Sequence, residues 1–142
     1  MAWCSLRPQF VRSDTDLGCR QARSTPFDRV IALDATSGQE LWVFDPVLPA
    51  DLHPDNDAIC RGVAVWHAEE TACADRVFLG TNDARLIALD LASGKPCAGF
   101  GSNGEITLPP DVGELHIDSA PTLVNDVVAW APPSTICRGL GR

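Results

Sequence analysis

The chain has 142 residues, enough to bury the core of one ordinary domain, and 45% of them are apolar, as is typical of a folded protein. A formal net charge of −8 with no basic patch argues against nucleic acid as a partner and against attraction to anionic lipid headgroups. No apolar run approaches the roughly 20 residues of a membrane-spanning helix, and residues 1–12 lack the pattern of a signal peptide.

The N-terminal segment, residues 1–24, shows no regular alternation of apolar and polar side chains. It therefore predicts no strand, and we interpret it as a divergent or aberrant segment. Truncation, a frame shift and natural divergence are all open as explanations of its character.

The first regular element is a predicted β-hairpin within residues 29–44. Aliphatic and β-branched residues 30–33 predict a strand that is buried on both faces. Asp34 is placed to cap the following turn, Gly38 supplies the residue that tolerates a positive φ, and residues 39–44 return as the next strand. Trp42 is expected to wedge against a neighbouring sheet.

This hairpin pattern repeats. Residues 29–38 recur as residues 85–94 at an offset of 56, with seven of the ten positions identical. Phe44 and Phe100 keep the same offset, whereas Ala98 stands in the place of Trp42. A repeat of this length is typical of solenoids and propellers.

The repeat organises the middle of the chain into blades. Residues 45–59, rich in Pro and Asp, predict a loop between blades. Residues 60–100 are then expected to hold four strands joined by turns, which make one complete blade. Two of its strands are predicted at 62–66 and 76–80, and Asn82-Asp83 is predicted to turn the chain into the repeat.

A further blade is predicted to begin near Ala120. Residues 122–124 and 127–130 have the composition of two strands, and Asn125-Asp126 has that of the turn between them. Residues 130–142 are interpreted as an aberrant C-terminal tail, because Pro132-Pro133 cannot lie in a central strand. The predicted fold class is all-β, with about two to three blades of a β-propeller.

The residues that bear chemistry exclude several kinds of site. None of the six cysteines forms a C-x-x-C pair beside which a histidine could complete a zinc site, so a zinc ribbon is not predicted. An even cysteine count permits three disulfides, and their connectivity stays open. Ser37 and Ser93 lack a paired histidine, which removes support for a hydrolase, and His67 and His116 are isolated in the sequence. No metal site is predicted, since the acidic residues lack the spacing of a calcium loop.

Residues 32–42 resemble the tryptophan-docking motif of quinoprotein dehydrogenases, whose eight blades close into a propeller. Cys60-Arg61-Gly62-Val63, followed by an aromatic strand, resembles the C-R-G-V segment of membrane-bound glucose and quinate dehydrogenases that depend on pyrroloquinoline quinone (PQQ). Residues 82–104 continue this likeness. The resemblance covers roughly residues 25–129, which we expect to be the partial propeller domain.

The resemblance implies the residues that contact the cofactor. Arg61 is expected there because a guanidinium binds carboxylates in a planar fork, and PQQ carries three carboxylates. Gly62 beside it would allow close backbone approach. Asp118 and Ser119 stand at the corresponding place of the next blade, where the family has a T-S-P-P-like stretch.

Structural alternatives to these cofactor contacts remain open. Arg61 can instead be a blade-edge arginine paired with Asp57 or Glu69, and residues 118–119 can be a solvated loop. Asp118 would repel an anionic cofactor unless a cation or Arg61 lay between them.

The resemblance implies a fragment of a PQQ-dependent oxidoreductase that oxidises the CH–OH group of a sugar or cyclic polyol, of glucose or quinate type, with a quinone acceptor. The alternative is a non-catalytic PQQ-like propeller that serves as a scaffold for protein partners. No catalytic residue is assigned, because the catalytic aspartate and calcium ligands of the family are implied to lie on later blades. We expect the chain to be inactive alone. The resemblance places the family on the periplasmic side of the inner membrane, held there by segments that this sequence lacks.

Overall fold

The structure is a computed structural model that describes residues 9–12, 19–50, 52, 62–67, 72–108, 117, 120–124 and 127–129. These residues form strands and turns, and they include no helix that could span a membrane. The strands are β1 (Gln9–Arg12), β2 (Cys19–Ser24), β3 (Val30–Asp34), β4 (Glu40–Phe44), β5 (Ala64–His67), β6 (Asp75–Gly80), β7 (Arg85–Asp90), β8 (Glu105–Thr107), β9 (Thr122–Val124) and β10 (Val127–Ala129).

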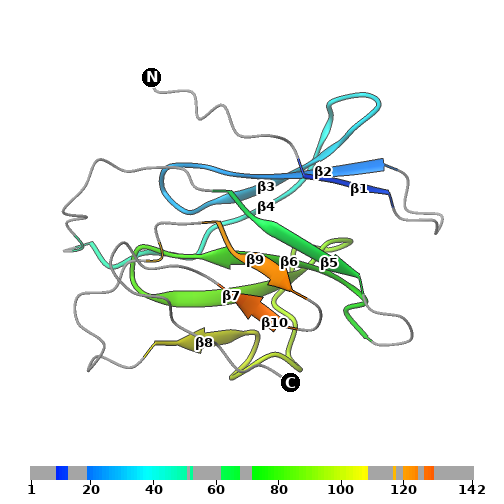
Figure 1. The fold of residues 1–142 in the computed structure, drawn as a ribbon. Helices are drawn as coiled ribbons and strands as arrows, with labels where there is room; N and C mark the ends of the chain where they lie inside the picture. Colours follow the sequence, from blue (N-terminus) through cyan, green and yellow to red (C-terminus); the bar gives the residue numbers. More distant parts are fainter. Residues whose placement is uncertain are drawn as a thin grey trace.

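These strands make three antiparallel sheets, each of which follows the chain order (Figure 1). The first sheet is β1-β2-β3-β4, the second is β5-β6-β7-β8, and the third is the hairpin of β9 and β10. The predicted all-β class is therefore confirmed.

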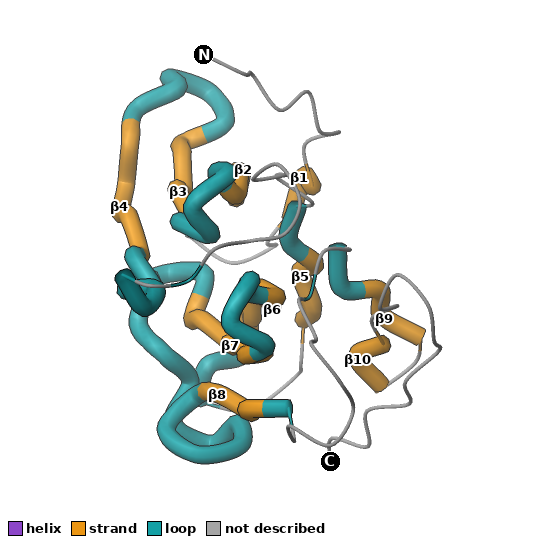
Figure 2. Tube along the Cα trace, turned by 90° about the vertical axis from the view of Figure 1, so that its left-hand side faces the viewer, coloured by secondary structure: helices purple, strands orange, loops and turns teal. Residues whose placement is uncertain are grey.

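The sheets are arranged like neighbouring sectors of a propeller. β5 lies beside β1 on one side and beside β9 on the other, so the first strands of successive sheets adjoin (Figure 2). The last strands, β4 and β8, lie on the opposite side of the molecule and are farther apart. Because β5 and β9 lie side by side, the strands before which the sequence predicts the cofactor contacts are neighbours.

Two apolar layers hold the sheets together. The first lies between sheets one and two and contains buried Val30, Val77 and Leu89, with Trp42 and Phe44 packed against it. The second lies between sheet two and the β9–β10 hairpin and contains Phe78, Leu86, Ala88 and Ile117, among others. Sheet two is therefore covered on both faces, and its strands β6 and β7 are accordingly almost continuous runs of buried apolar residues.

The sequence repeat is reproduced in the backbone. Asp34 caps its turn through the amide of Ser37 at 2.7 Å, and Asp90 caps the equivalent turn through the amide of Ser93 at 2.7 Å. Both turns close on a glycine with positive φ, 73° at Gly38 and 71° at Gly94. These predicted turns are confirmed.

Trp42 docks on the second copy of the motif, as predicted. Its indole Nε1 donates to the carbonyl oxygen of Leu91 at 3.0 Å. Its ring lies over Gly94, where an added Cβ would come within 2.6 Å of the indole. The carbonyl oxygens of Leu91 and Ala92 also accept from Arg20 Nη1, at 3.3 and 2.8 Å. Side chains from two strands of the first sheet, β2 and β4, therefore hydrogen-bond to the turn of the second repeat.

The prediction that residues 60–100 contain the whole second blade is wrong at its last strand. The chain forms only an isolated bridge at Pro96, and the fourth strand is β8, at 105–107. Pro96 lacks an amide donor, and Cys97 forms a disulfide with Cys73. Cys97 and Gly104 both still hydrogen-bond to Ala88 of β7, and residues 98–103 between them leave the sheet before β8 pairs with the first half of β7.

Phe44 and Phe100 are not structurally equivalent, although they share the repeat offset. Phe44 ends β4 and packs against the first apolar layer. Phe100 lies in the turn before β8 and meets the ring of Phe78 edge to face, with 5.4 Å between the ring centroids.

Two strands were not predicted at all. β1 and β2 fall within residues 1–24, and β2 pairs with β3 along its length, from Arg20 opposite Asp34 to Ser24 opposite Val30. The predicted hairpin near residue 120 is present as β9 and β10, while the predicted turn at 125–126 and the tail from residue 130 lie outside the described residues.

Candidate functional site

The candidate site lies at one end of the sheets, which we call the Gly62 end. Here β2 ends and β3 begins in sheet one, while β5 begins and β6 ends in sheet two. The loop between β6 and β7 lies at the same end, because β7 begins beside the end of β6.

Gly62 lies two residues before β5 and has a φ of 97°. This conformation is rarely open to residues with a Cβ, so glycine is required by the backbone. The amide of Gly62 donates to Ser24 Oγ at 3.1 Å, a contact that crosses from sheet two to sheet one. Since this amide already has an acceptor, Gly62 would serve a cofactor by its shape rather than as a donor.

The other three predicted site residues, Arg61, Asp118 and Ser119, lie outside the described residues. Their positions along the chain are related, since Arg61 comes three residues before β5 and Ser119 three residues before β9.

Ile117, which precedes Asp118 and Ser119, is described, and it is buried. Its amide donates to the carbonyl oxygen of Thr81 at 3.2 Å, and its side chain lies against Gly80. Gly80 ends β6, so Ile117 is anchored at the same end of sheet two at which Gly62 lies.

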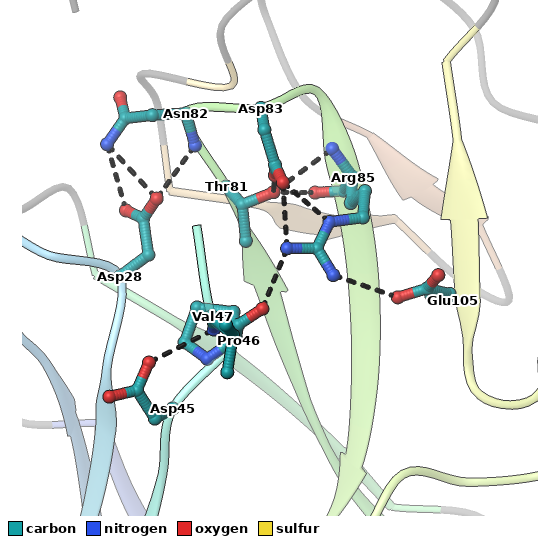
Figure 3. Close-up of polar contacts among 9 residues, drawn as sticks. All are labelled: Asp28, Asp45, Pro46, Val47, Thr81, Asn82, Asp83, Arg85 and Glu105. Atoms are coloured by element: carbon teal, nitrogen blue, oxygen red, sulfur yellow. Dashed lines mark hydrogen bonds and ion pairs between the residues drawn. The ribbon is translucent and has the colours of Figure 1, made fainter. Parts of the chain in front are cut away.

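A polar network joins the two sheets at this end (Figure 3). The Asp28 carboxylate, from the turn between β2 and β3, accepts from the backbone amide of Asn82 at 2.7 Å and from its side-chain amide at 3.1 Å. Asp28 is buried, and this burial raises the pKa of its carboxyl group to about 6 against the opposing effect of the Asn82 hydrogen bonds.

Arg85 is the centre of the second half of the network (Figure 3). Its guanidinium contacts the Asp83 carboxylate at 2.7 Å and Glu105 at 3.2 Å, and it donates to the carbonyl oxygen of Pro46 at 2.9 Å. The hydrogen bond with Asp83 is the main cause that raises the pKa of Arg85. Arg85 thus ties β8 and the chain after β4 to the start of β7.

The sequence did not reveal this network. Asn82 and Asp83 were predicted only as a turn, and the partner of Asn82 lies 54 residues away in the chain. One sequence signal did indicate that the two turns of the network are equivalent: Thr25 and Thr81 share the 56-residue offset of the repeat. Both begin turns closed by the same pair of backbone hydrogen bonds, Thr25 with Asp28 and Arg29, and Thr81 with Ala84 and Arg85.

His67 also has a partner that the sequence did not suggest. Its Nδ1 contacts the Asp75 carboxylate across the β5–β6 pair, at the end of the sheet opposite Gly62. Among the described residues, no group of three or more histidine, cysteine or acidic side chains could hold a metal ion.

Comparison with known proteins identifies the fold. The family described as "PQQ: Glucose/ethanol/alcohol dehydrogenase, beta-propeller domain" matches residues 22–133. The chain belongs to this family.

Several characterised relatives share this propeller. The chain is 31% identical over 135 residues to quinoprotein glucose dehydrogenase A of Acinetobacter calcoaceticus, an alignment that covers 76% of this chain and 17% of the relative. It is 34% identical over 114 residues to quinoprotein glucose dehydrogenase of Escherichia coli, with 72% and 14% covered. It is 31% identical over 131 residues to quinate/shikimate dehydrogenase (quinone) of Acinetobacter baylyi, with 73% and 16% covered. The chain thus spans about a sixth of the length of these PQQ-family relatives.

The described part of the site is compatible with PQQ in one respect. The chain enters β5, the first strand of its sheet, through Gly62. Because glycine has no Cβ, a planar ligand could approach the backbone there. The guanidinium suited to the PQQ carboxylates belongs to Arg61, the residue before it.

Proposed function

We propose that the chain forms part of a PQQ-dependent oxidoreductase that oxidises the CH–OH group of a sugar or cyclic polyol, of glucose or quinate type, with a quinone as electron acceptor. The observation that carries this proposal is that Gly62, before β5, and Ile117, before β9, lie at the same end of sheet two in a PQQ-family propeller. Bound PQQ would accept the two electrons of the alcohol, while the protein supplies orientation and charge.

In this proposal Arg61 binds a carboxylate of PQQ and Gly62 permits the close approach. Ser119 and Asp118 contribute polar contacts from the next blade. Asp118 requires Arg61 or a cation between itself and the cofactor, because two anionic groups repel each other. Calcium would be held by residues outside this chain.

We further propose that the protein works in an oxidising compartment, the periplasm. The Cys73–Cys97 disulfide supports this, since structural disulfides persist outside the reducing cytosol.

The test of the cofactor role is equilibrium dialysis of PQQ against the 142-residue chain and its Arg61→Ala variant. One charge-assisted contact contributes about 1.5–3 kcal/mol, so the wild-type chain is expected to bind only weakly, and Arg61→Ala to bind about tenfold or more weakly still. Arg23→Ala is the matched control, because Arg23 is an exposed arginine that donates to Gln21 within sheet one. Equal PQQ binding by wild type and Arg61→Ala would refute the role of Arg61.

The chain alone is proposed to be inactive, because the resemblance puts the catalytic aspartate on a later blade. Purified chain supplied with PQQ and calcium should not reduce a dye acceptor with glucose or quinate as substrate. Dye reduction that depends on added PQQ would show instead that these residues suffice for catalysis.

A further inference from the structure

The end of β2 at Ser24 and the turn that follows it, residues 25–29, contact two separate loops of sheet two. Ser24 accepts from the amide of Gly62, which lies before β5. Asp28 accepts from Asn82, which lies between β6 and β7. One turn of the first blade therefore holds two chain segments at the Gly62 end of the second.

Ser24 is itself held firmly. It pairs with Val30 as the last residue of β2, and the next residue, Thr25, donates from its amide to the carbonyl oxygen of Arg29 at 2.8 Å. The Asp28 amide closes the turn on the carbonyl oxygen of Thr25 at 3.0 Å. The Ser24 hydroxyl is thus presented from a backbone whose position is set by sheet one.

Gly62, by contrast, needs an external constraint. Glycine has access to a wide range of φ, and its left-handed value here is one conformation among several. Val63 and Ala64, which follow it, are buried in the two apolar layers and cannot shift to compensate. The hydrogen bond to Ser24 is therefore placed to select the conformation of Gly62 and, with it, the direction from which the chain arrives.

We propose that Ser24 is a positioning residue for the cofactor site: by holding the amide of Gly62, it fixes the backbone that PQQ would approach before β5. The proposal rests on the proposed PQQ site and assigns part of that site to the preceding blade. The cofactor-contacting segment of one blade is then aligned by the blade before it.

The experiment uses the ¹⁵N-labelled 142-residue chain and compares wild type, Ser24→Ala and Ser24→Thr. The first readout is hydrogen exchange of the Gly62 amide without cofactor. Ser24→Ala should raise that exchange rate about fivefold, the factor that corresponds to one neutral hydrogen bond. Ser24→Thr keeps the hydroxyl and should restore the wild-type rate. The Ile31 amide, opposite Arg23, reports whether β2 and β3 remain paired.

The second readout is the affinity for PQQ measured by dialysis. Ser24→Ala should lose about fivefold in affinity, again the equivalent of one hydrogen bond, and Ser24→Thr should recover it. Ser102→Ala is the matched control, because Ser102 is an exposed turn serine, and it should change neither readout.

The outcomes separate this proposal from the proposed function. Unchanged Gly62 exchange in Ser24→Ala overturns the positioning role. Faster exchange with unchanged PQQ affinity, while Arg61→Ala still weakens binding, also overturns it and leaves the function of Arg61 intact. If Arg61→Ala binds PQQ as wild type does, the proposed function fails, and the positioning role fails with it.

Discussion

Gly38 and Gly94 occupy the same place in two copies of one motif, yet their surroundings differ. Their φ values are 73° and 71°, so a side chain would meet similar backbone strain at either position. A Cβ at Gly38 has no neighbour within 4 Å, whereas at Gly94 it would come within 2.6 Å of the Trp42 ring. The pair thus separates the conformational role of the glycine from its role as the surface on which a tryptophan docks.

We predict that Gly38→Ala destabilises the chain by about 1–2 kcal/mol, the cost of a left-handed alanine. Gly94→Ala should cost about 1–3 kcal/mol more, because the indole must move. Urea denaturation of the two variants measures the difference. Equal losses would mean that Trp42 does not depend on the absence of a Cβ at Gly94.

Asp28 makes stability depend on pH in a way unusual for an aspartate. Its carboxyl pKa is raised from 3.8 to about 6 in the folded chain, so the folded state binds the proton more tightly than the unfolded state. Its contribution to stability is therefore fully present below about pH 4 and is lost as the pH rises through about 6.

We predict that wild type loses on the order of 3 kcal/mol relative to Asp28→Asn between pH 4 and pH 7. The asparagine keeps an acceptor for Asn82 but does not titrate. The measurement is the free energy of unfolding of both proteins across that range. Asp34→Asn is the control of opposite sign, since hydrogen bonds from Ser37 lower the pKa of Asp34, which is exposed in its turn.

At the scale of elements, the Cys73–Cys97 disulfide joins the segment before β6 to the segment that leaves the sheet after β7. Its two cysteines are 24 residues apart, and Cys97 is buried in the second apolar layer. The bond thus fixes the point at which residues 98–103 leave the sheet.

Replacing both cysteines by serine is predicted to destabilise the chain by about 3 kcal/mol, the chain-entropy value for a loop of this size. Thermal melts with and without reductant provide the test. Wild type should be sensitive to reductant and the double variant should not. A wild-type melting temperature that is indifferent to reductant would contradict the predicted contribution of the disulfide.

The elements also show how far the sequence could lead. The hairpin turns were predicted because Asp34 and Gly38 act on neighbouring backbone atoms, and the docking of Trp42 was predicted from the motif. The place of β8 was not, because it depends on Pro96 and on a disulfide that spacing alone cannot assign. β2 was not predicted either, since its pairing with β3 gives a mostly polar strand its structure.

In the candidate site, too, contacts between residues distant in the sequence could not be predicted. Gly62 was predicted only to allow close approach of the cofactor to the backbone, which stays a prediction, and its positive φ was not foreseen. Its acceptor, Ser24, lies 38 residues earlier and on another sheet, so no local pattern could indicate it. The cofactor roles of Arg61, Asp118 and Ser119 stay predictions.

At the scale of the whole molecule, the part of sheet one's outer face that β4 forms is apolar and exposed. Leu41 and Val43 on β4 are 42% and 46% exposed, and they alternate along the strand with Trp42 and Phe44, which face sheet two. β4 is also the last strand of its sheet, so its outer edge has no partner strand in that sheet. Such a surface invites association.

We predict that the 142-residue chain self-associates and that Leu41→Lys with Val43→Lys weakens this association at least tenfold, which corresponds to about 1.4 kcal/mol. Phe27→Lys is the control, because Phe27 is 71% exposed but lies in the turn between β2 and β3 and not on β4. Sedimentation velocity over a range of concentrations measures the effect. A wild-type chain that stays monomeric throughout would contradict the prediction.

The hydrogen bonds from sheet one to the turn at residues 90–94 determine where a blade can be cut out and transferred to another propeller. A blade excised at its strand boundaries, from β1 to β4, would take Trp42 and Arg20 away from the carbonyl oxygens of Leu91 and Ala92 that accept their hydrogen bonds. The smallest transferable unit is therefore longer than a blade and must carry the following turn as its receptor. A chimera built from this chain should accordingly be joined after Gly94 rather than after Phe44, so that Trp42 keeps the glycine on which its ring packs.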